Sequence, residues 1–599
     1  MGQRVKDTAG KLTVPILYLL VSLAFTWPLA LHAATTVIGP FYGDNLEYVW
    51  KIWWVRHAWF EQHSSPWLVP GVYYPYGYPL AHSEITPLHT FAMLPINLLL
   101  GEVWTYNLAI VLSTWLSGWF TYLWLMHMTD GCKGGSFVGG LIVALCPYRM
   151  ARIAGHLPLV STEGIPLVLW GMERFWEQRR WGDSLMIAVG ITISALSSWY
   201  YALALGCLVP IYWLVRARPW RNWITDQRFW LGTGLSLLIT LGALGPFLPP
   251  YLGIARAGLA RVPLEEADFW SASLADYVLP NWRHPLWGAS VRRVFQSSGE
   301  PLPYEFLLSF GYVGGTLSLF GWRRGCHRAK RAIVAWTVAA LVLSFGPSFH
   351  LLPGWALKLP LPVSWVTGLS SALTWLGEHS LAREPFTLSL DGGMVIPLPA
   401  LIVRWFVPAA VGMRSWARFA FFATLGVAAL AALGLNVVKH ETVSRNQAIW
   451  HRRLPAVVAS LLVLFEFYTG PQALAQVKPR PVDEWLAQQP GEFTIVQMPL
   501  NVALSGPQMF YTRFHGKNII SGYGTYFPLL FEEWYPELAE FPNDVSVERL
   551  ERWPVRYVLV DQADLSDHPD LANAFVHQPR LRLVTTIEGI DVYAVVVDK

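Results

Sequence analysis

Residues 304–351 set a basic segment between two apolar stretches, reading YEFLLSFGYVGGTLSLFGW (304–322), RRGCHRAKR (323–331) and AIVAWTVAALVLSFGPSFHL (332–351). Each apolar stretch has close to the roughly 20 residues that a helix needs to cross the hydrocarbon core of a bilayer. Lys and Arg collect in cytoplasmic loops because positive charge resists translocation. We therefore expect two membrane spans here, joined by a cytoplasmic loop.

The same alternation repeats along the whole chain. Six short loops contain 20 of its 44 Lys and Arg residues, and long apolar stretches separate them. If all six loops are cytoplasmic, the N-terminus is cytoplasmic too and the C-terminus lies outside. The chemistry must then be sought on the outer face. The six loops are Met1–Lys11, Met128–Gly134, Arg174–Gly182, Arg216–Arg228, Arg323–Arg331 and Val438–Arg453.

The composition supports a polytopic membrane protein and excludes several other classes. Hydrophobic residues make up 53% of the chain and charged residues only 14%, whereas soluble domains carry about 25% charged residues. The four cysteines lack CxxC spacing, so the sequence indicates neither a disulfide framework nor a zinc site. The chain has no basic stripe that would suggest nucleic acid as a partner.

The apolar stretches predict an all-α membrane domain of about eleven spans in residues 1–470. The first span follows a basic N-terminus, and we expect it to be an uncleaved anchor, with cleavage near Ala33 as the alternative. Residues 183–215 form either a tight hairpin of two helices or one long helix. The predicted spans are 12–33, 103–127, 135–149, 157–175, 183–198, 199–215, 229–251, 304–322, 332–351, 416–437 and 454–470.

The side on which the later loops lie depends on whether the apolar segment Thr86–Leu100 crosses the membrane. If it crossed the membrane, three later basic loops would face outwards against the charge rule. Pro87 and Pro95 also favour a broken helix. We therefore expect a re-entrant or surface-lying helix within a long first external loop, 34–102. The other external loops are then 149–156, 252–303 and 352–415.

Residues 471–599 have the pattern of a small α/β domain outside the membrane. They carry 10 Lys and Arg against 17 Asp and Glu, a net charge of −7. Alternating apolar residues predict strands, and helical periodicity predicts helices between them. The predicted strands are Phe493–Met498, Arg556–Val560, Leu581–Ile587 and Val592–Val597, and the predicted helices are Val482–Gln488 and Ser546–Trp553.

The first external loop opens with two carboxylates in front of an aromatic helix. Asp44 and Glu47 are three residues apart, and Trp50, Trp53 and Trp54 follow on one helical face. That face predicts an amphipathic helix lying in the membrane interface. The two acids form either a helix-capping arrangement or a general base that deprotonates an acceptor hydroxyl. The two interpretations are compatible, because a cap would hold the carboxylate still.

The second external loop carries Arg149, Arg152 and His156, and Glu163 follows just below the outer surface. Outward-facing Arg opposes the charge rule and needs a reason. These side chains either snorkel to lipid head groups or bind a substrate phosphate, whose shape suits Arg. An acid inside a span is a functional candidate, although Glu163 is equally explained as a structural partner of the two Arg residues.

Cationic side chains recur before later spans. His284 lies in the external loop 252–303, and Arg414 and Arg418 flank the start of the span at 416. Arg418 should lie about one turn inside the outer leaflet, where an unpaired cation is costly. It therefore needs an acid in an internal salt bridge or a substrate phosphate. The sequence shows no P-loop, HExxH or nucleophile elbow in a meaningful place, and it assigns no metal ligand.

Several short motifs follow one another in a recognisable order: Gly43-Asp44, Tyr73–Gly77, Gly155-His156, Ile165–Leu167, Tyr277–Pro280, His284–Gly288, Arg414–Phe419 and Val555–Val560. Together they resemble the GT-C superfamily of polytopic membrane glycosyltransferases, and more closely a broad bacterial group with that architecture. The resemblance spans most of the chain. An insertion at about 366–412, which includes Asp391-Gly392-Gly393, departs from the pattern.

The resemblance implies an enzyme that takes a sugar from a polyprenyl-phosphate carrier on the outer face of the cell membrane. The acceptor would be a glycan, a lipid or a protein, and membrane lipids would surround the chain. Asp44 would be the general base, with Glu163 in the place of a supporting acid. External Arg side chains would neutralise the leaving phosphate, and attack opposite it would invert the anomeric centre. Some relatives use a divalent metal ion and others do not, so this stays open.

Two other functions are compatible with the sequence. A non-catalytic envelope-assembly protein of the same architecture would keep the fold and lose the transfer reaction. A transporter or lipid-carrier flippase is the second alternative. Such proteins often have inverted repeats and polar sites at the membrane midplane, but this chain shows no internal repeat, and its polar residues cluster towards one face.

Overall fold

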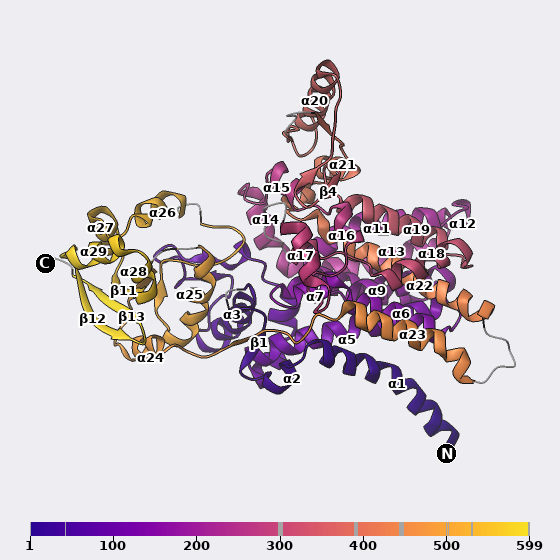
Figure 1. The fold of residues 1–599 in the computed structure, drawn as a ribbon, viewed down its shortest axis with the longest axis horizontal. Coiled ribbons are helices and arrows are strands. Elements are labelled where there is room, and N and C mark those ends of the chain that lie inside the picture. Colours follow the sequence, from indigo (N-terminus) through magenta and orange to yellow (C-terminus); the bar gives the residue numbers. More distant parts are fainter. Residues whose placement is uncertain are drawn as a thin grey trace.

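The computed structural model describes residues 2–41, 43–296, 304–388, 393–442, 449–498, 500, 502–528 and 531–596. Figure 1 shows an elongated molecule, with a bundle of helices at one end and a sheet flanked by helices at the other. The first external loop and the helix that follows Asp44 lie between the two. This arrangement puts the start of that helix at the junction of the bundle and the C-terminal segment.

A helix corresponds to each predicted span. Among the residues that the structure describes, four stretches are long and apolar enough to cross a membrane: Glu102–Met128, Trp199–Arg216, Gln227–Arg256 and Trp416–Lys439. The total of eleven spans stays a prediction. The bundle helices are α1 (Gly2–Phe25), α5 (Glu102–Met128), α6 (Lys133–Leu145), α9 (Gly164–Gln178), α10 (Trp181–Ser197), α11 (Trp199–Arg216), α13 (Gln227–Leu244), α18 (Tyr312–Arg324), α19 (Lys330–Ser344), α22 (Ala420–Thr442) and α23 (Ile449–Phe467).

Short elements connect these helices. They are α2 (Leu29–His32), β1 (Thr36–Ile38), η1 (His57–Glu61), β2 (Leu68–Val69), β3 (Tyr78–Pro79), η2 (Leu80–His82), α7 (Pro147–Arg152), α8 (Leu157–Val160), α12 (Arg221–Ile224), η4 (Gly245–Phe247), α14 (Leu248–Arg256), α15 (Leu264–Phe269), α16 (Leu274–Val278), α17 (Gly288–Gln296), η5 (Tyr304–Phe306), β4 (His350–Leu352), β5 (Trp355–Ala356), η6 (Pro408–Gly412) and η7 (Trp416–Phe419).

Breaks in the helical backbone answer two questions that the sequence left open. Ser198 has an extended backbone (φ −151°, ψ 132°), so residues 183–215 form two helices rather than one. Thr86–Leu100 folds as η3 (Leu88–Ala92) and α4 (Leu94–Leu100) on either side of Met93. Seven residues of α-helix reach about 10 Å, far short of the roughly 30 Å hydrocarbon core. The expected broken helix is confirmed.

Close helix packing in the bundle depends on small residues. Helix α22 runs against α18, and Gly321 of α18 faces Gly434 of α22. A Cβ added at Gly321 would collide with the backbone oxygen of Leu430, and one at Gly434 with that of Leu317. Small residues at such positions let two backbones approach closely, which is how helices associate when lipid removes the hydrophobic driving force.

Helix α3 (Asn45–Arg56) differs from its predicted setting. It is buried around most of its circumference, with Trp50 and Trp54 only 1% and 4% exposed. It packs against α5 and α4 on the bundle side and against α25 (Val502–His515) of the C-terminal segment. The prediction of a helix lying in the membrane interface is therefore wrong. Its aromatic face is covered by a segment more than 400 residues later in the chain, which local periodicity does not reveal.

The C-terminal segment forms a five-stranded sheet in the order β10-β9-β11-β13-β12. The first three strands run parallel, and β13 is antiparallel to both β11 and β12. All four predicted strands and both predicted helices are present within two residues of their expected bounds. The strands are β9 (Thr494–Met498), β10 (Asn518–Ile519), β11 (Val555–Asp561), β12 (Leu581–Ile587) and β13 (Ile590–Val595). The helices are α24 (Pro481–Gln488), α25, α26 (Phe531–Ala539), α27 (Asp544–Arg552), α28 (Gln562–Asp567) and α29 (Pro569–His577).

The C-terminal segment is fastened to the first external loop. Strand β8 (Leu474–Gln476) pairs antiparallel with β1 (Thr36–Ile38) just after the last bundle helix. The Trp50 indole N–H donates to Thr512 Oγ1 at 2.9 Å, and the Tyr73 hydroxyl donates to the backbone oxygen of Gly522 at 2.9 Å. These contacts bring the loop at 521–528 against the start of α3, where Asp44 lies.

Candidate functional site

Asp44 lies directly before α3, but it does not act as a side-chain cap. Its backbone is helical (φ −62°, ψ −12°), and its carboxylate makes no capping hydrogen bond. The Tyr523 hydroxyl instead donates to Asp44 Oδ1 at 2.7 Å, and His156 Nε2 lies 3.4 Å from Oδ2. The capping interpretation of Asp44 is therefore wrong. With 31% of its side chain exposed, the carboxylate remains open to a ligand.

The two polar partners of Asp44 have pKa values that are shifted so that both side chains are uncharged near pH 7. Burial and the Asp44 carboxylate both raise the pKa of Tyr523, so its hydroxyl stays protonated. Burial lowers the pKa of His156, although the charge of Asp44 partly offsets this effect. His156 is therefore neutral near pH 7. The Asp44 carboxylate is thus held between two neutral polar groups from distant parts of the chain.

Glu305 of η5 gathers two of the predicted cations. Arg152 Nη2 lies 3.1 Å from Glu305 Oε2, and Arg418 Nε lies 2.8 Å from Oε1. Ser415 Oγ donates to the same Oε1 at 2.6 Å. Burial alone would raise the pKa of Glu305, but the two guanidinium groups hold it well below its usual value. The expectation that Arg418 needs an anionic partner is confirmed, and that partner is an acid of the chain.

Glu84 is a second carboxylate near Asp44. Ser198 Oγ, at the break between α10 and α11, donates to Glu84 Oε1 at 2.8 Å. Burial raises the pKa of Glu84, and the charge of Arg418 opposes that rise while the charge of Asp44 adds to it. Next to it, the Arg418 guanidinium stacks on the Tyr200 ring, 4.1 Å from its centroid. Asp44, Glu84 and Arg418 thus belong to one electrostatic cluster.

Arg414 stands at the rim of this cluster. Its guanidinium pairs with Glu266 at 2.8 Å and stacks over Trp270, and 53% of the side chain is exposed. The backbone N–H of Arg414 donates to the Tyr200 hydroxyl at 3.3 Å. The predicted residues that the structure brings together are therefore Asp44, Arg152, His156, Arg414 and Arg418.

Four other predicted residues lie in structural contacts instead. Glu47 is buried between Lys51, at 2.6 Å, and Ser83, at 2.5 Å. Glu163 accepts a hydrogen bond from Ser113 at 2.7 Å in a separate buried cluster. In that cluster Arg149 donates to Ser113 at 3.1 Å and to the Val160 oxygen at 3.0 Å.

His284 is the fourth of these residues. Its ring stacks on Trp287 at 3.5 Å, and its Nε2 lies 3.0 Å from the backbone oxygen of Phe465. These contacts tie the external loop to the end of α23. The structure thus gives Glu47, Arg149, Glu163 and His284 local partners, and their predicted functional roles stay predictions.

Sequence reasoning missed Tyr523, Glu84 and Glu305. Glu305 carried a usable signal, because it is an acid within a predicted span, where ionisable groups are rare and functional. Glu84 lies among apolar and small residues of the first external loop and carried little signal. Tyr523 carried none, since it reaches Asp44 from 479 positions along the chain.

The site does not present a preformed metal cage. Among the described residues, no group of three or more His, Cys, Asp or Glu side chains is placed to hold a metal ion. Asp44 and His156 form a pair, and Glu84 is bound by Ser198.

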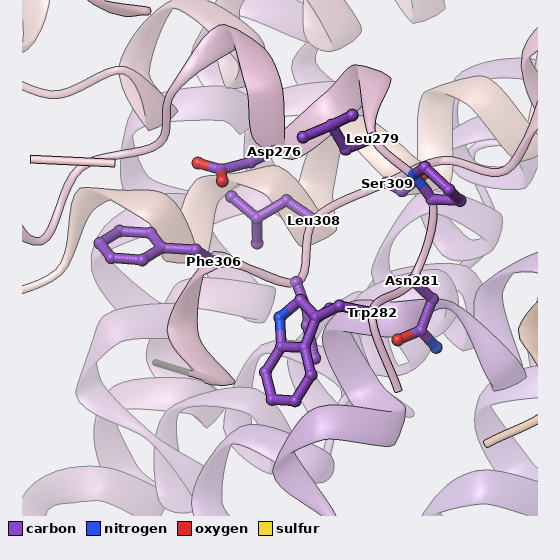
Figure 2. Close-up of a pocket in the computed structure, with 9 residues that line it drawn as sticks. Asp276, Leu279, Asn281, Trp282, Phe306, Leu308 and Ser309 are labelled. Atoms are coloured by element: carbon purple, nitrogen blue, oxygen red, sulfur yellow. The ribbon is translucent and has the colours of Figure 1, made fainter. Parts of the chain in front are cut away.

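A very small pocket of about 10 Å³ lies between α16, the segment 279–282 and the segment 306–309. Figure 2 shows that the Asp276 carboxylate and the Asn281 amide in its wall point in different directions. Asp276 caps its own helix by accepting the Ser273 N–H at 2.6 Å, and burial raises its pKa to about 7. Because these polar side chains do not converge on one point, we attribute the pocket to the packing of the surrounding loop.

A larger apolar groove of about 1610 Å³ runs between α11 and α19. Its wall includes Ala202 and Leu203, within one helical turn of Tyr200, and Val338 of α19. Helix α21 (Pro399–Phe406) contributes Pro399 and Val403 to it. The first groove residues on α11 therefore lie within one helical turn of Tyr200, on which Arg418 stacks.

Comparison with solved structures assigns the fold. The mycobacterial arabinofuranosyltransferase AftD aligns with a TM-score of 0.56 at 13% identity, over 98% of this chain and 40% of that chain. The chain has a GT-C-like fold. It spans 40% of the length of AftD. No family model and no curated protein matches the sequence.

Weaker likenesses include two further GT-C proteins. ArnT from Cupriavidus metallidurans, solved bound to undecaprenyl phosphate, aligns with a TM-score of 0.45 at 14% identity over 98% of both chains. The oligosaccharyltransferase AglB from Archaeoglobus fulgidus gives a TM-score of 0.41 at 13% identity, over 98% of this chain and 74% of that chain. In the present chain Asp44 lies directly before α3, and its position on the outer side of the membrane stays a prediction.

Proposed function

We propose that this chain transfers a sugar from a polyprenyl-phosphate donor to an acceptor hydroxyl on the outer face of the cell membrane. One observation carries the proposal. The partly exposed Asp44 carboxylate already accepts a short hydrogen bond from a hydroxyl, that of Tyr523, at 2.7 Å. An acceptor hydroxyl at the free side of the same carboxylate would have the geometry that general base catalysis needs.

The cations and the apolar groove support a lipid-phosphate donor. Arg152 and Arg418 share one carboxylate, Glu305, so this trio keeps a net charge of +1. Arg418 stacks on Tyr200, which lies within one helical turn of the groove residues Ala202 and Leu203 on α11. A carrier lying with its apolar chain in the groove would present its phosphate to that positive charge. Arg is well suited to bind phosphate.

The reaction follows from this placement. Asp44 takes the proton of the acceptor hydroxyl, and the oxygen forms a bond to the anomeric carbon of the sugar. The bond from that carbon to the carrier phosphate breaks, and its electron pair leaves with the polyprenyl phosphate. Arg418 and Arg152 stabilise the charge that develops on this leaving group. Attack and departure on opposite faces invert the anomeric centre.

The proposal includes an orientation. The N-terminus and the basic loops lie in the cytoplasm, and the C-terminal segment lies outside with Asp44. The acceptor is a glycan, a lipid or a protein, and the sugar is not specified by the residues named here. Surrounding membrane lipids are the remaining partner.

The decisive experiment compares Asp44→Asn with the wild type in turnover of a panel of polyprenyl-phosphate sugars by the purified, reconstituted protein. General base catalysis contributes about 10²–10⁴-fold, and a loss of that size is expected with unchanged binding of the carrier. Asp567→Asn is the control, because that side chain lies on an exposed turn of α28 far along the chain. Full turnover by Asp44→Asn would disprove the role of Asp44 as the base.

A further inference from the structure

An arm projects sideways from the helix bundle. It consists of residues 358–388 and 393–406, and its tip is α20 (Val363–Glu378). Strands β6 (Lys358–Leu359) and β7 (Met394–Val395) pair at its base, and α21 returns the chain to the bundle. Figure 1 shows α20 standing clear of the other helices, at the end of the bundle that faces the C-terminal sheet. The arm overlaps most of the insertion predicted at about 366–412, for which the proposed function gives no role. Asp391 and Gly392 of that insertion lie outside the described residues.

The arm has a small core of its own and is firmly built. Its core is a separate cluster that includes Val366, Phe386, Leu401 and Trp405. The buried Arg404 guanidinium makes a two-pronged salt bridge to Glu384, with both N–O distances at 2.6 Å. Such a bidentate pair fixes the geometry of the groups it joins. The position of α20 is therefore set by the fold.

The tip of this arm is apolar and uncovered. Val363 is 78% exposed, Trp365 65%, Trp375 61% and Leu381 68%, and Leu369 between them is 47% exposed. Residues 359–377 contain no Asp, Glu, Lys, Arg or His. Contiguous exposed apolar surface of this kind marks a site of contact with a protein or a membrane.

Three observations favour lipid as the partner that covers the exposed apolar surface of the arm. Helix α21, at the root of the arm, contributes to the apolar groove and also exposes Ile402 and Phe406 by 56% and 43%, so one apolar surface runs from the groove onto the arm. Charged residues stand only at the ends of the apolar run, with Lys358 before it and Glu378 after it. Trp residues lie near both ends of α20, and Trp is enriched where a bilayer meets water.

We infer that α20 inserts into the outer leaflet as an in-plane helix beside the mouth of the apolar groove, in contact with lipid acyl chains. Its 16 residues give a length of about 24 Å, less than the roughly 30 Å needed to cross. It therefore lies along the interface with its apolar surface in the acyl region. The inference concerns lipid contact alone and does not depend on the transfer reaction.

Accessibility of single spin labels tests this inference in the full-length protein. The label is placed at Leu369→Cys in a background where the exposed native cysteine is replaced, Cys326→Ser. Leu238→Cys on α13, 68% exposed, is the reference for lipid, and Val576→Cys on α29, 77% exposed, is the reference for water. A blank without an introduced cysteine corrects for the remaining thiols. The protein is reconstituted in nanodiscs of phosphatidylethanolamine and phosphatidylglycerol.

The readout is the ratio of accessibility to oxygen over accessibility to a water-soluble nickel chelate. We expect the ratio at position 369 to match that at position 238 and to exceed that at position 576 several-fold. A ratio equal to that at position 576 overturns the inference, because α20 would then lie in water. Dipolar broadening of the label at 369 also overturns it, because the occupant would then be the arm of a second copy.

Discussion

At the scale of single residues, the central feature is a carboxylate held by two groups that stay neutral. Tyr523 fixes one oxygen of Asp44, and His156 stands near the other. These contacts orient Asp44, while about a third of its side chain stays accessible. Tyr523 acts through Asp44, so it is a positioning residue in the proposed reaction.

Replacing Tyr523 tests this positioning role. Tyr523→Phe removes one hydrogen bond to a charged group, worth about 1.5–3 kcal/mol, and turnover should fall about 10-fold or more with little change in apparent carrier affinity. Tyr535→Phe is the matched control, since that hydroxyl donates only to the Leu500 oxygen at 3.2 Å. Equal activity of both variants would show that Tyr523 does not position Asp44.

His156 sets the expected pH dependence. Because burial lowers its pKa, His156 stays neutral as pH falls from 8 through its ordinary value of about 6.5. It becomes a cation only at lower pH, where it would pair with Asp44 and weaken the base. Turnover should therefore be flat across that range and fall only below it. In the His156→Gln variant, the part of the fall in turnover at low pH that is due to His156 should be absent from the pH–rate profile. An unchanged fall at low pH would argue against this role of His156.

At the scale of elements, the Glu305 carboxylate links two separate segments at one end of the bundle. It connects α7 through Arg152 with η7 through Arg418 and Ser415. Removing one member of a buried charge cluster destabilises the fold, because the remaining charges are then neither solvated nor paired. The Glu305 carboxylate therefore holds the proposed phosphate-binding cations in place.

Removing the Glu305 carboxylate should destabilise the protein. Breaking a buried ion pair costs about 3–5 kcal/mol, so Glu305→Gln should lower the midpoint of thermal unfolding in detergent markedly. The control Glu548→Gln breaks an exposed pair with Arg552 at 2.6 Å, worth about 0–1 kcal/mol. An equal, small effect of the two changes would contradict the role of Glu305.

The pH dependence of that stability has a defined sign. The two Arg residues hold the pKa of Glu305 well below its usual value in the folded protein. Its contribution is fully present above the unfolded value of about 4.3 and is lost as pH falls through the lower folded value. The difference in unfolding midpoint between wild type and Glu305→Gln should thus be constant from pH 8 to 5 and shrink only in stronger acid.

At the scale of the whole molecule, the site lies at a seam. Asp44 belongs to the first external loop, and Tyr523 comes from the C-terminal segment, which is also tied to that loop through Trp50 and Thr512. The fit is close, because a Cβ at Gly522 or Gly524 would collide with Tyr73 or Tyr78. Movement of the C-terminal segment would therefore reach the proposed base directly.

A change at the seam tests this coupling without touching the site. Gly524→Ala places a methyl group against the buried Tyr78 hydroxyl and 3.2 Å from Ser83 Cβ. Such overpacking costs about 1–3 kcal/mol, and the loop should shift and carry Tyr523 away from Asp44. Turnover should fall to the level of Tyr523→Phe or below. Gly245→Ala, where an added Cβ meets nothing within 4 Å, should leave turnover unchanged.

The sequence by itself determined the elements and their order. Apolar length and basic loops located the bundle helices, and alternating residues located β9, β11, β12 and β13, because these signals are local and periodic. The helix that begins directly after Asp44 was predicted from the same kind of local signal. The position of Arg418 inside a predicted span also predicted an anionic partner for it, since an unpaired cation in a membrane span is energetically unfavourable.

The tertiary structure alone decided which side chains meet. It buried α3 under α25, paired Tyr523 with Asp44, and made Glu305 the partner of Arg152 and Arg418. It also moved Glu163 and Arg149 into another cluster. These contacts join residues up to 479 positions apart, and such pairings depend on how whole helices pack. Periodicity along the chain records which face of an element is apolar, but not which distant element covers it.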